Sequence, residues 1–111
     1  MSGRRVAVLG DMLELGEFAP EFHRQVGAAA AACGIARLHA VGPLAAETVR
    51  GAREAGLGDV HAHADATAAA AAVTAALRDG DLVVVKGSRG IHLETVRDAV
   101  VAARGAAEGE R

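Results

Sequence analysis

A run of four apolar residues, three of them valine, precedes a lysine and a glycine-bracketed loop in the stretch 82–90, LVVVKGSRG. The run has no alternating polar position, and it therefore predicts a strand buried on both faces, as in a parallel sheet. Lys86, the only lysine of the chain, follows at the strand end, and a helical apolar pattern begins after Ile91. A strand, a glycine loop and a helix in this order direct backbone N–H groups toward an anion. The stretch predicts a central strand and a binding loop.

Three earlier apolar runs are each followed by a helical pattern. We expect strands at about residues 6–9, 38–42, 59–63 and 81–86, and helices at about 20–33, 43–56, 66–78 and 91–104. This alternation predicts right-handed crossovers and a parallel sheet. The predicted fold class is α/β, a Rossmann-like open, mainly parallel sheet with helices on both faces, in a single domain spanning residues 1–111.

The first and fourth predicted strands are the most apolar, so we expect them side by side at the centre of a sheet ordered 3-2-1-4. The chain direction reverses between them, and open α/β sheets bind ligands outside the carboxyl ends of the strands at such a point. The loops 10–16 and 87–90 follow these two strands. The first loop is longer than most strand-to-helix connections, which favours a binding role. The sequence predicts one site between the two loops.

The two loops carry opposite charges. Asp11 and Glu14 lie in the first, and Lys86 and Arg89 lie at the second. A ligand with an ammonium group at one end and a carboxylate at the other would match both loops. The alternative is a solvated rim of mixed charge, which most α/β proteins possess.

Other candidate residues have simpler interpretations. His61 and His63 share a strand face, but no third metal ligand is evident nearby, which favours an exposed edge-strand pair over a metal site. His23 is interpreted as a capping or packing residue. Cys33 ends a helix and is predicted to lie in the core. The inward face predicted for the helix 20–33 consists of Phe22, Val26, Ala29, Ala30 and Cys33.

Composition excludes several classes of function. Aromatic residues make up 2% of the chain, the formal net charge is -2 and no basic run occurs, which argues against nucleic-acid binding. The single cysteine excludes an internal disulfide and fits a reducing compartment. No apolar run approaches about 20 residues, so no membrane span is expected. Without an N-terminal signal-peptide pattern, the sequence predicts a cytoplasmic protein.

Four motifs in a fixed order carry a resemblance. The chain contains GDMLELG at residues 10–16, HRQVG at 23–27, VG at 41–42 and VKGSRG at 85–90. With these motifs, residues 4 to about 103 resemble the C-terminal domain of Mur ligases. The type they resemble most adds D-alanyl-D-alanine to UDP-N-acetylmuramoyl-tripeptide.

The resemblance implies a mechanism for the full-length enzyme. In such ligases ATP phosphorylates the terminal carboxylate of the tripeptide, the amine of D-alanyl-D-alanine attacks the acyl phosphate, and phosphate leaves. ATP and Mg²⁺ are implied for the full-length enzyme, with none bound tightly by this domain, because a central domain carries the phosphate loop. The N-terminal and central domains are absent from this sequence, so we expect a fragment that is inactive alone. The implied role is peptidoglycan synthesis in the cytoplasm, and with it cell wall biogenesis, cell shape and cell division.

The expected site contains substrate-binding residues only, with no catalytic and no metal-binding residue. We expect the dipeptide carboxylate beside the Ser88–Gly90 backbone and Arg89, and its amine beside Asp11 rather than Glu14, because Asp11 is nearer the strand end. The expected substrate-binding residues are Asp11, Met12, Glu14, Lys86, Gly87, Ser88, Arg89 and Gly90.

Two alternatives remain open from the sequence. A sister ligase, one that adds another amino acid to the muramoyl peptide or glutamate to a folate, would share the fold but not the GDMLELG loop. A stand-alone binding domain of Rossmann shape would share the fold and perform no chemistry.

Overall fold

The apolar runs form one parallel sheet in the computed structural model, which describes residues 3–13 and 15–104. The strands are β1 (Arg5–Gly10), β2 (Arg37–Val41), β3 (Val60–His63) and β4 (Leu82–Lys86). Their order is β3-β2-β1-β4 and every neighbouring pair is parallel, which confirms the predicted order and fold class. The carboxyl ends of the described strands therefore lie along one edge of the sheet.

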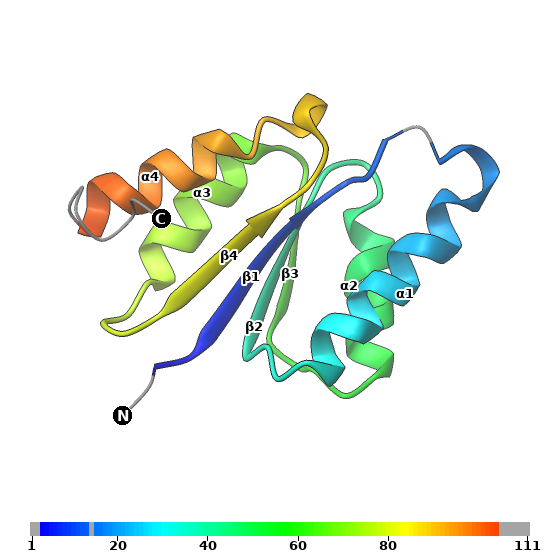
Figure 1. The fold of residues 1–111 in the computed structure, drawn as a ribbon, viewed down its shortest axis with the longest axis horizontal. Coiled ribbons are helices and arrows are strands. Elements are labelled where there is room, and N and C mark those ends of the chain that lie inside the picture. Colours follow the sequence, from blue (N-terminus) through cyan, green and yellow to red (C-terminus); the bar gives the residue numbers. More distant parts are fainter. Residues whose placement is uncertain (1–2, 14, 105–111) are drawn as a thin grey trace.

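Helices cover both faces of the sheet, as predicted. Figure 1 shows α1 (Ala19–Ala32) and α2 (Ala45–Glu54) on one side, and α3 (Ala66–Ala76) and α4 (Glu94–Arg104) on the other. Asp65 caps α3, because its carboxylate accepts the amide of Ala68 at 2.9 Å. Two short 3-10 turns, η1 (Gly16–Phe18) and η2 (Arg89–Ile91), precede α1 and α4, so the fourth helix begins later than predicted.

Two apolar clusters form the core, one on each face of the sheet. Side chains that alternate along a strand point to opposite faces, so Val8 joins one cluster while its neighbour Ala7 joins the other. The cluster beneath α3 and α4 is built on Val8, Val41, Ala69, Val73, Leu93 and Val96. The cluster on the opposite face contains Ala7, Leu38, Ala40, Ala45, Val49, Ala52 and Val60.

The buried face of α1 differs from the prediction. It consists of Ala19, His23 and Gly27, whereas Phe22 is 39% exposed and Cys33 is exposed. The reason is that α1 packs closely against α2 rather than directly on the sheet, and Gly27 lies at that contact, where a Cβ would not fit. The predictions of an inward Phe22 and Ala29 and of a core Cys33 are therefore wrong.

β4 lies at an edge of the sheet and is not buried on both faces. Val83 and Val85 pack toward α3 and α4, but Leu82 is 58% exposed and Val84 is 46% exposed. On the opposite face α2 packs over β2 and β3, which leaves Leu82 and Val84 partly open to solvent. The prediction of a central, doubly buried strand is wrong, although its neighbour β1 was predicted correctly.

The different exposure of the two faces of β4 predicts that truncating two neighbouring valines lowers the free energy of unfolding by different amounts. Val84→Ala should lower the free energy of unfolding by less than about 1 kcal/mol, because the side chain already meets solvent. Val85→Ala should lower it by about 1–2 kcal/mol, because two methyl groups leave the packed face. Urea denaturation of both variants measures the difference, and equal losses would contradict the exposed face of β4.

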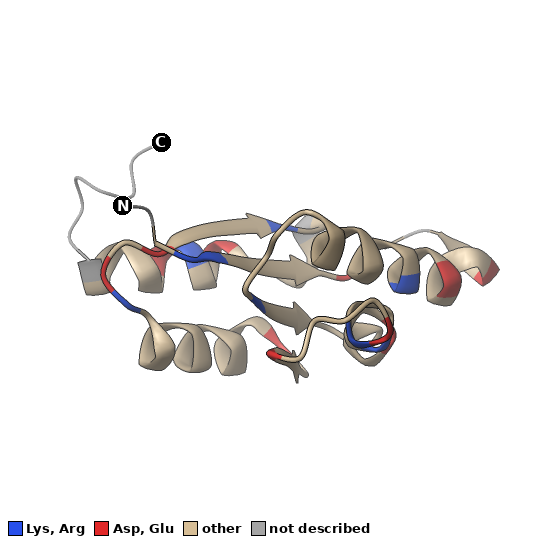
Figure 2. Cartoon of the chain, turned by 90° about the horizontal axis from the view of Figure 1, so that it is seen from below, with Lys and Arg blue, Asp and Glu red and all other residues tan. Residues whose placement is uncertain are grey.

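Charged residues are interspersed over the loops and helix surfaces (Figure 2). One ion pair ties the starts of β1 and β4: Arg4 Nε and Nη2 donate to the two carboxylate oxygens of Asp81, each at 3.0 Å. The hydrogen bond from Arg4 is the main reason that the pKa of Asp81 is lowered, and it outweighs burial. Within the described part of the chain, no helix has the length and apolar character that crossing a membrane requires.

Candidate functional site

The loops after β1 and β4 begin side by side at the carboxyl edge of the sheet. Leu9 pairs with Lys86 at the ends of the two strands. Beyond them the amide of Ser88 donates to the carbonyl of Asp11 at 3.2 Å, and the amide of Leu13 donates to the Ser88 hydroxyl at 2.9 Å. These bonds join the two loops directly, so their predicted meeting at the reversal point is confirmed.

Two glycines permit this close approach. A Cβ atom on Gly87 would lie 2.9 Å from both the Cα of Gly10 and the Cδ1 of Leu93. A side chain at Gly87 would therefore push the two loops apart. The glycine that follows the lysine serves the packing of the two loops, in addition to any approach of a ligand.

Lys86 is the exposed cation of the site. It lines an open hollow of about 360 Å³ together with Ser88, Glu94 and Arg97. It also lines a smaller, mostly apolar hollow of about 120 Å³, which Met12 shares. Lys86 takes part in none of the ion pairs between described residues, so its ammonium group is available to an anionic ligand.

Asp11 is placed at the predicted edge, but its carboxylate turns away from it. The side chain is buried, and its two oxygens lie 3.1 and 2.9 Å from the amide of Leu44 at the start of α2. Gly42, at φ +121°, makes room for it, because a Cβ there would lie 2.7 Å from the Asp11 carboxyl carbon. Asp11 therefore fixes the start of α2. The expectation that it faces a substrate amine requires correction, since a buried and bonded carboxylate cannot reach an ammonium ion outside.

The remaining predicted residues have mixed outcomes. Met12 is half-buried, and its amide donates to the imidazole of His23 at 3.0 Å. Gly90 follows in the loop, close to the Leu13 side chain. Glu14 and the side chain of Arg89 lie outside the described residues, so their expected roles stay predictions.

A larger open cleft, of about 600 Å³, lies at the same edge. Loops that follow all four described strands contribute to it, among them Leu13, Gly42 and Gly90. The polar residues of this cleft were not predicted, because the predicted site included only the loops after the two most apolar strands. The signal was available, since every loop after a parallel strand opens on the same edge. The missed polar residues are Asp65, Thr67, His92 and Thr95.

Comparison with known proteins identifies the family of this fold. The family described as Mur ligase, glutamate ligase domain, matches residues 1–89. The chain belongs to this family. The resemblance drawn from the GDMLELG and VKGSRG motifs is thereby confirmed.

Named relatives of this Mur ligase domain are D-alanyl-D-alanine ligases. The UDP-N-acetylmuramoyl-tripeptide–D-alanyl-D-alanine ligase of Bacillus subtilis (strain 168) is 36% identical over 95 residues, which are 85% of this chain and 21% of that protein. The crystal structure II of MurF from Acinetobacter baumannii has a TM-score of 0.80 at 24% identity and covers 92% of this chain and 23% of that chain. MurF ligase from Thermotoga maritima in complex with ADP has a TM-score of 0.67 at 24% identity, covering 91% of this chain and 22% of its own. The chain thus spans about a fifth of the length of these proteins.

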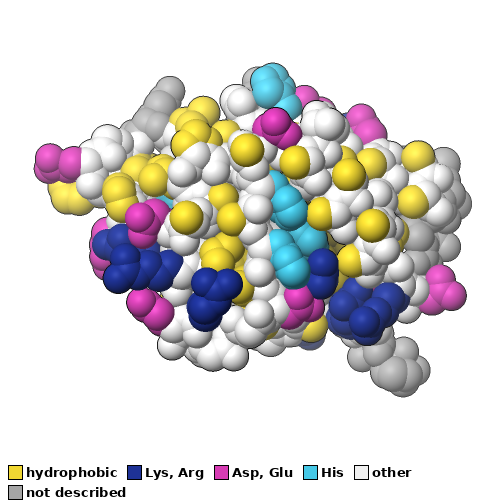
Figure 3. All heavy atoms as spheres, turned by 180° about the vertical axis from the view of Figure 1, so that it is seen from behind, with side chains coloured by type: hydrophobic (Ala, Val, Ile, Leu, Met, Phe, Trp, Pro, Cys, Tyr) yellow, Lys and Arg dark blue, Asp and Glu magenta, His cyan; other side chains and the backbone are white. Residues whose placement is uncertain are grey.

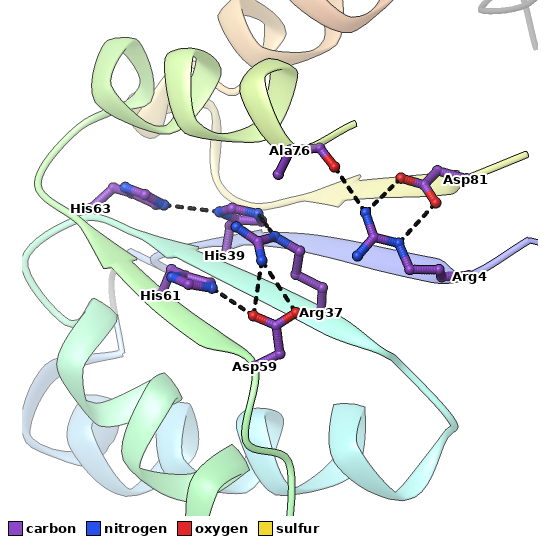
Figure 4. Close-up of polar contacts among 8 residues, drawn as sticks. All are labelled: Arg4, Arg37, His39, Asp59, His61, His63, Ala76 and Asp81. Carbon is purple, nitrogen blue, oxygen red and sulfur yellow. Dashed lines mark hydrogen bonds and ion pairs between the residues drawn. The ribbon is translucent and has the colours of Figure 1, made fainter. Parts of the chain in front are cut away.

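A second polar cluster of the Mur ligase domain lies on β2 and β3, on the other side of the sheet's strand order from β4. The view from behind shows histidine side chains gathered beside acidic and basic ones (Figure 3), and Figure 4 shows how they lie. His39 is fully buried between the rings of His61 and His63, each with its centroid 5.2 Å away. Among the described residues, no group of three or more His, Cys, Asp or Glu side chains could hold a metal ion.

The hydrogen bonds of this cluster fix His39 in its neutral form. Arg37 Nε donates to His39 Nε2 at 3.0 Å, so the proton of the ring is on Nδ1, which donates to His63 Nε2 at 2.9 Å. Burial, followed by the nearby charge of Arg37, lowers the pKa of His39 to about 4. Asp59 completes the cluster by accepting from Arg37 at 2.9 Å and by bonding His61 at 2.7 Å. Protonation of this buried cluster at acidic pH should therefore lower the stability of the fold.

Proposed function

We propose that this chain is the C-terminal domain of an ATP-dependent ligase that adds D-alanyl-D-alanine to UDP-N-acetylmuramoyl-tripeptide. The observation that carries the proposal is the hydrogen-bonded pair of loops, in which the GDM segment and Ser88 hold each other beside the exposed Lys86. These residues lie within residues 1–89, the range that matches the family. The name of the Bacillus subtilis relative supplies the substrates of the proposal.

In this proposal Lys86 and its loop bind the carboxylate of the dipeptide. A carboxylate in the hollow lined by Lys86 and Ser88 can accept from the ammonium group. The bidentate contact expected of Arg89 from the sequence stays a prediction. Such a contact orients the dipeptide with its amine directed out of the domain. The Asp11 carboxylate accepts the amide of Leu44. The proposal therefore assigns the contact with the dipeptide amine to Glu14 instead of Asp11.

The chemistry of phosphate transfer belongs, in this proposal, to the rest of the ligase. The sequence lacks a G-x-x-x-x-G-K-[ST] phosphate loop, and the described residues offer no cluster of metal ligands. The chain alone therefore does not fit ATP phosphates with Mg²⁺, although ADP is bound in the Thermotoga maritima relative. The role of this domain is to bind and orient the incoming dipeptide, and we expect the chain alone to be inactive. The same proposal assigns it to peptidoglycan synthesis in the cytoplasm, and with it to cell shape and cell division, in association with the N-terminal and central domains of such a ligase.

A titration of the ¹⁵N-labelled chain with D-alanyl-D-alanine tests the proposal. The dipeptide should shift the amide resonances of Gly87, Ser88 and Gly90. Lys86→Ala should weaken its binding about tenfold, because a hydrogen bond to a charged group contributes roughly 1.5–3 kcal/mol. Arg53→Ala removes an exposed cation in the last turn of α2 and should leave the affinity for the dipeptide unchanged.

L-alanyl-L-alanine is the matched control ligand, since it has the same charges and composition with the opposite handedness. It should bind more weakly than the D,D dipeptide. The proposal fails if millimolar D-alanyl-D-alanine leaves the loop after β4 unshifted, or if Lys86→Ala and Arg53→Ala have the same effect on its affinity.

A further inference from the structure

Three successive backbone amides of the loop after β1 donate to three different parts of the fold. The amide of Asp11 donates to the last carbonyl of β2 at 3.0 Å. The amide of Met12 donates to His23 Nε2, on α1, at 3.0 Å. The amide of Leu13 donates to the hydroxyl of Ser88, in the loop after β4, at 2.9 Å. Residues 11–13 have no regular secondary structure, so these three bonds determine their position.

The acceptor on α1 is a buried histidine with a defined tautomer. His23 is 2% exposed, and its Nδ1 lies 2.6 Å from the carbonyl oxygen of Ala19, one helical turn earlier. A carbonyl oxygen only accepts, so Nδ1 carries the proton and Nε2 keeps its lone pair for the amide of Met12. Both nitrogens of the neutral ring are thus used. One holds the ring to α1, and the other holds the loop to the ring.

A polar imidazole is unusual at a buried position of a helix such as that of His23 in α1. His23 lies between Ala19 and Gly27 on the face of α1 that packs inside the molecule. A buried polar group costs free energy unless it is hydrogen-bonded, whereas an apolar residue would fill the same space without that cost. What the imidazole adds over an apolar side chain is the acceptor that it presents to Met12.

We propose that His23 is a positioning residue for the ligand-binding loop. By fixing the Met12 amide it sets the register of residues 11–13 against the loop of Lys86 and Ser88. His23 acts on the ligand only through the loop backbone that it holds. Figure 1 shows the start of α1 beside the end of this loop. This inference rests on the proposed function, because the loop that His23 holds is the one assigned to the dipeptide.

Two substitutions separate the two bonds of the ring. In His23→Gln the side-chain amide reaches the place of Nε2, so its oxygen can still accept from Met12. In His23→Asn the shorter side chain reaches the place of Nδ1, where its NH₂ group can donate to Ala19 but leaves the Met12 amide without a partner. Amide hydrogen exchange at Met12 and the dissociation constant for D-alanyl-D-alanine are measured in both variants. His61→Asn is the matched control at the opposite edge of the sheet.

His23→Asn should speed exchange at Met12 about tenfold, which corresponds to about 1.4 kcal/mol, and should weaken dipeptide binding several-fold, because the Met12 amide loses its acceptor. His23→Gln and His61→Asn should keep both values near those of the wild type. The inference is overturned if the Asn and Gln variants behave alike, or if His23→Asn frees the amide without changing the affinity. If the wild-type chain binds no dipeptide, the proposed function fails. Exchange at Met12 then decides by itself whether His23 fixes the loop.

Discussion

Gly51→Ala should lower the free energy of unfolding by about 3 kcal/mol or more, although alanine is the better helix former by about 1 kcal/mol. A Cβ atom at this position of α2 would lie 1.9 Å from the carbonyl oxygen of Arg24 in α1. The facing glycine has the same restriction, since a Cβ on Gly27 would lie 2.0 Å from the carbonyl oxygen of Thr48. Both contacts are with backbone, which cannot move aside as a flexible side chain can. Urea or thermal denaturation measures the loss.

Gly58→Ala is the matched control. Gly58 lies between α2 and β3, and a Cβ there would have no atom within 4 Å. The substitution should change the free energy of unfolding by less than about 0.5 kcal/mol. A neutral or stabilising Gly51→Ala would contradict the close crossing of α1 and α2. Comparable losses at Gly51 and Gly58 would mean that glycine itself, rather than the helix contact, determines the cost.

Most of the fold could be predicted because its signals are local. Apolar runs of strand length alternate with helical patterns, and helix signals such as Asp65 stand beside their helices. The parallel sheet followed from the handedness of the crossovers, and its strand order followed from placing the two most apolar strands side by side. These signals require no knowledge of which side chains meet across the fold.

The burial of particular faces could not be predicted in the same way. Phe22 looks like a core residue from its spacing, yet the helix contact made by Gly27 and Gly51 turns His23 inward in its place. Val84 looks buried on composition. The predicted order 3-2-1-4 puts the fourth strand at an edge, but nothing local reveals which of its faces is open to solvent. Burial depends on partners far along the chain.

The meeting of the two loops was predicted, but the side-chain contacts within them were not. Position at a strand end was enough to bring Ser88 and Lys86 to the loop after β1. It was not enough to orient the Asp11 carboxylate, whose partner Leu44 is 33 positions away in the sequence. His23 was interpreted as a capping or packing residue, and its burial agrees with packing. Its hydrogen bond to the Met12 amide could not be predicted, since such a bond leaves no periodic signal.

The chain should lose stability as the pH falls from about 6.5 to about 4. The pKa of His39 is lowered from 6.5 to about 4, mainly by burial and then by the charge of Arg37. Between these values the unfolded chain binds a proton that the folded chain does not, so lower pH favours unfolding. The full shift corresponds to about 3 kcal/mol. Urea denaturation at a series of pH values measures the slope, which should vanish above about pH 7.5.

The loss has a second stage with a different cause. The pKa of Asp81 lies below its ordinary value of 3.8, chiefly because of the hydrogen bond from Arg4. Its contribution is present above that value and is lost as the pH falls further. As the pH falls, the loss of stability caused by the histidines therefore comes before the loss caused by the carboxylates. A chain in which only Asp81 mattered would keep a constant stability down to about pH 4.

His39→Gln identifies the source of the first stage. Glutamine offers one acceptor and one donor, as the neutral ring does, but it does not titrate. The variant should be less stable than the wild type at pH 8 and should lose much less stability between pH 6.5 and 4, with a residual slope from His63, whose pKa is lowered mainly by burial. His92→Gln changes a side chain that is 72% exposed and should keep the wild-type slope. If His39→Gln kept the full slope, the proton would bind elsewhere, and the buried ring would not be the acid-sensitive element of this domain.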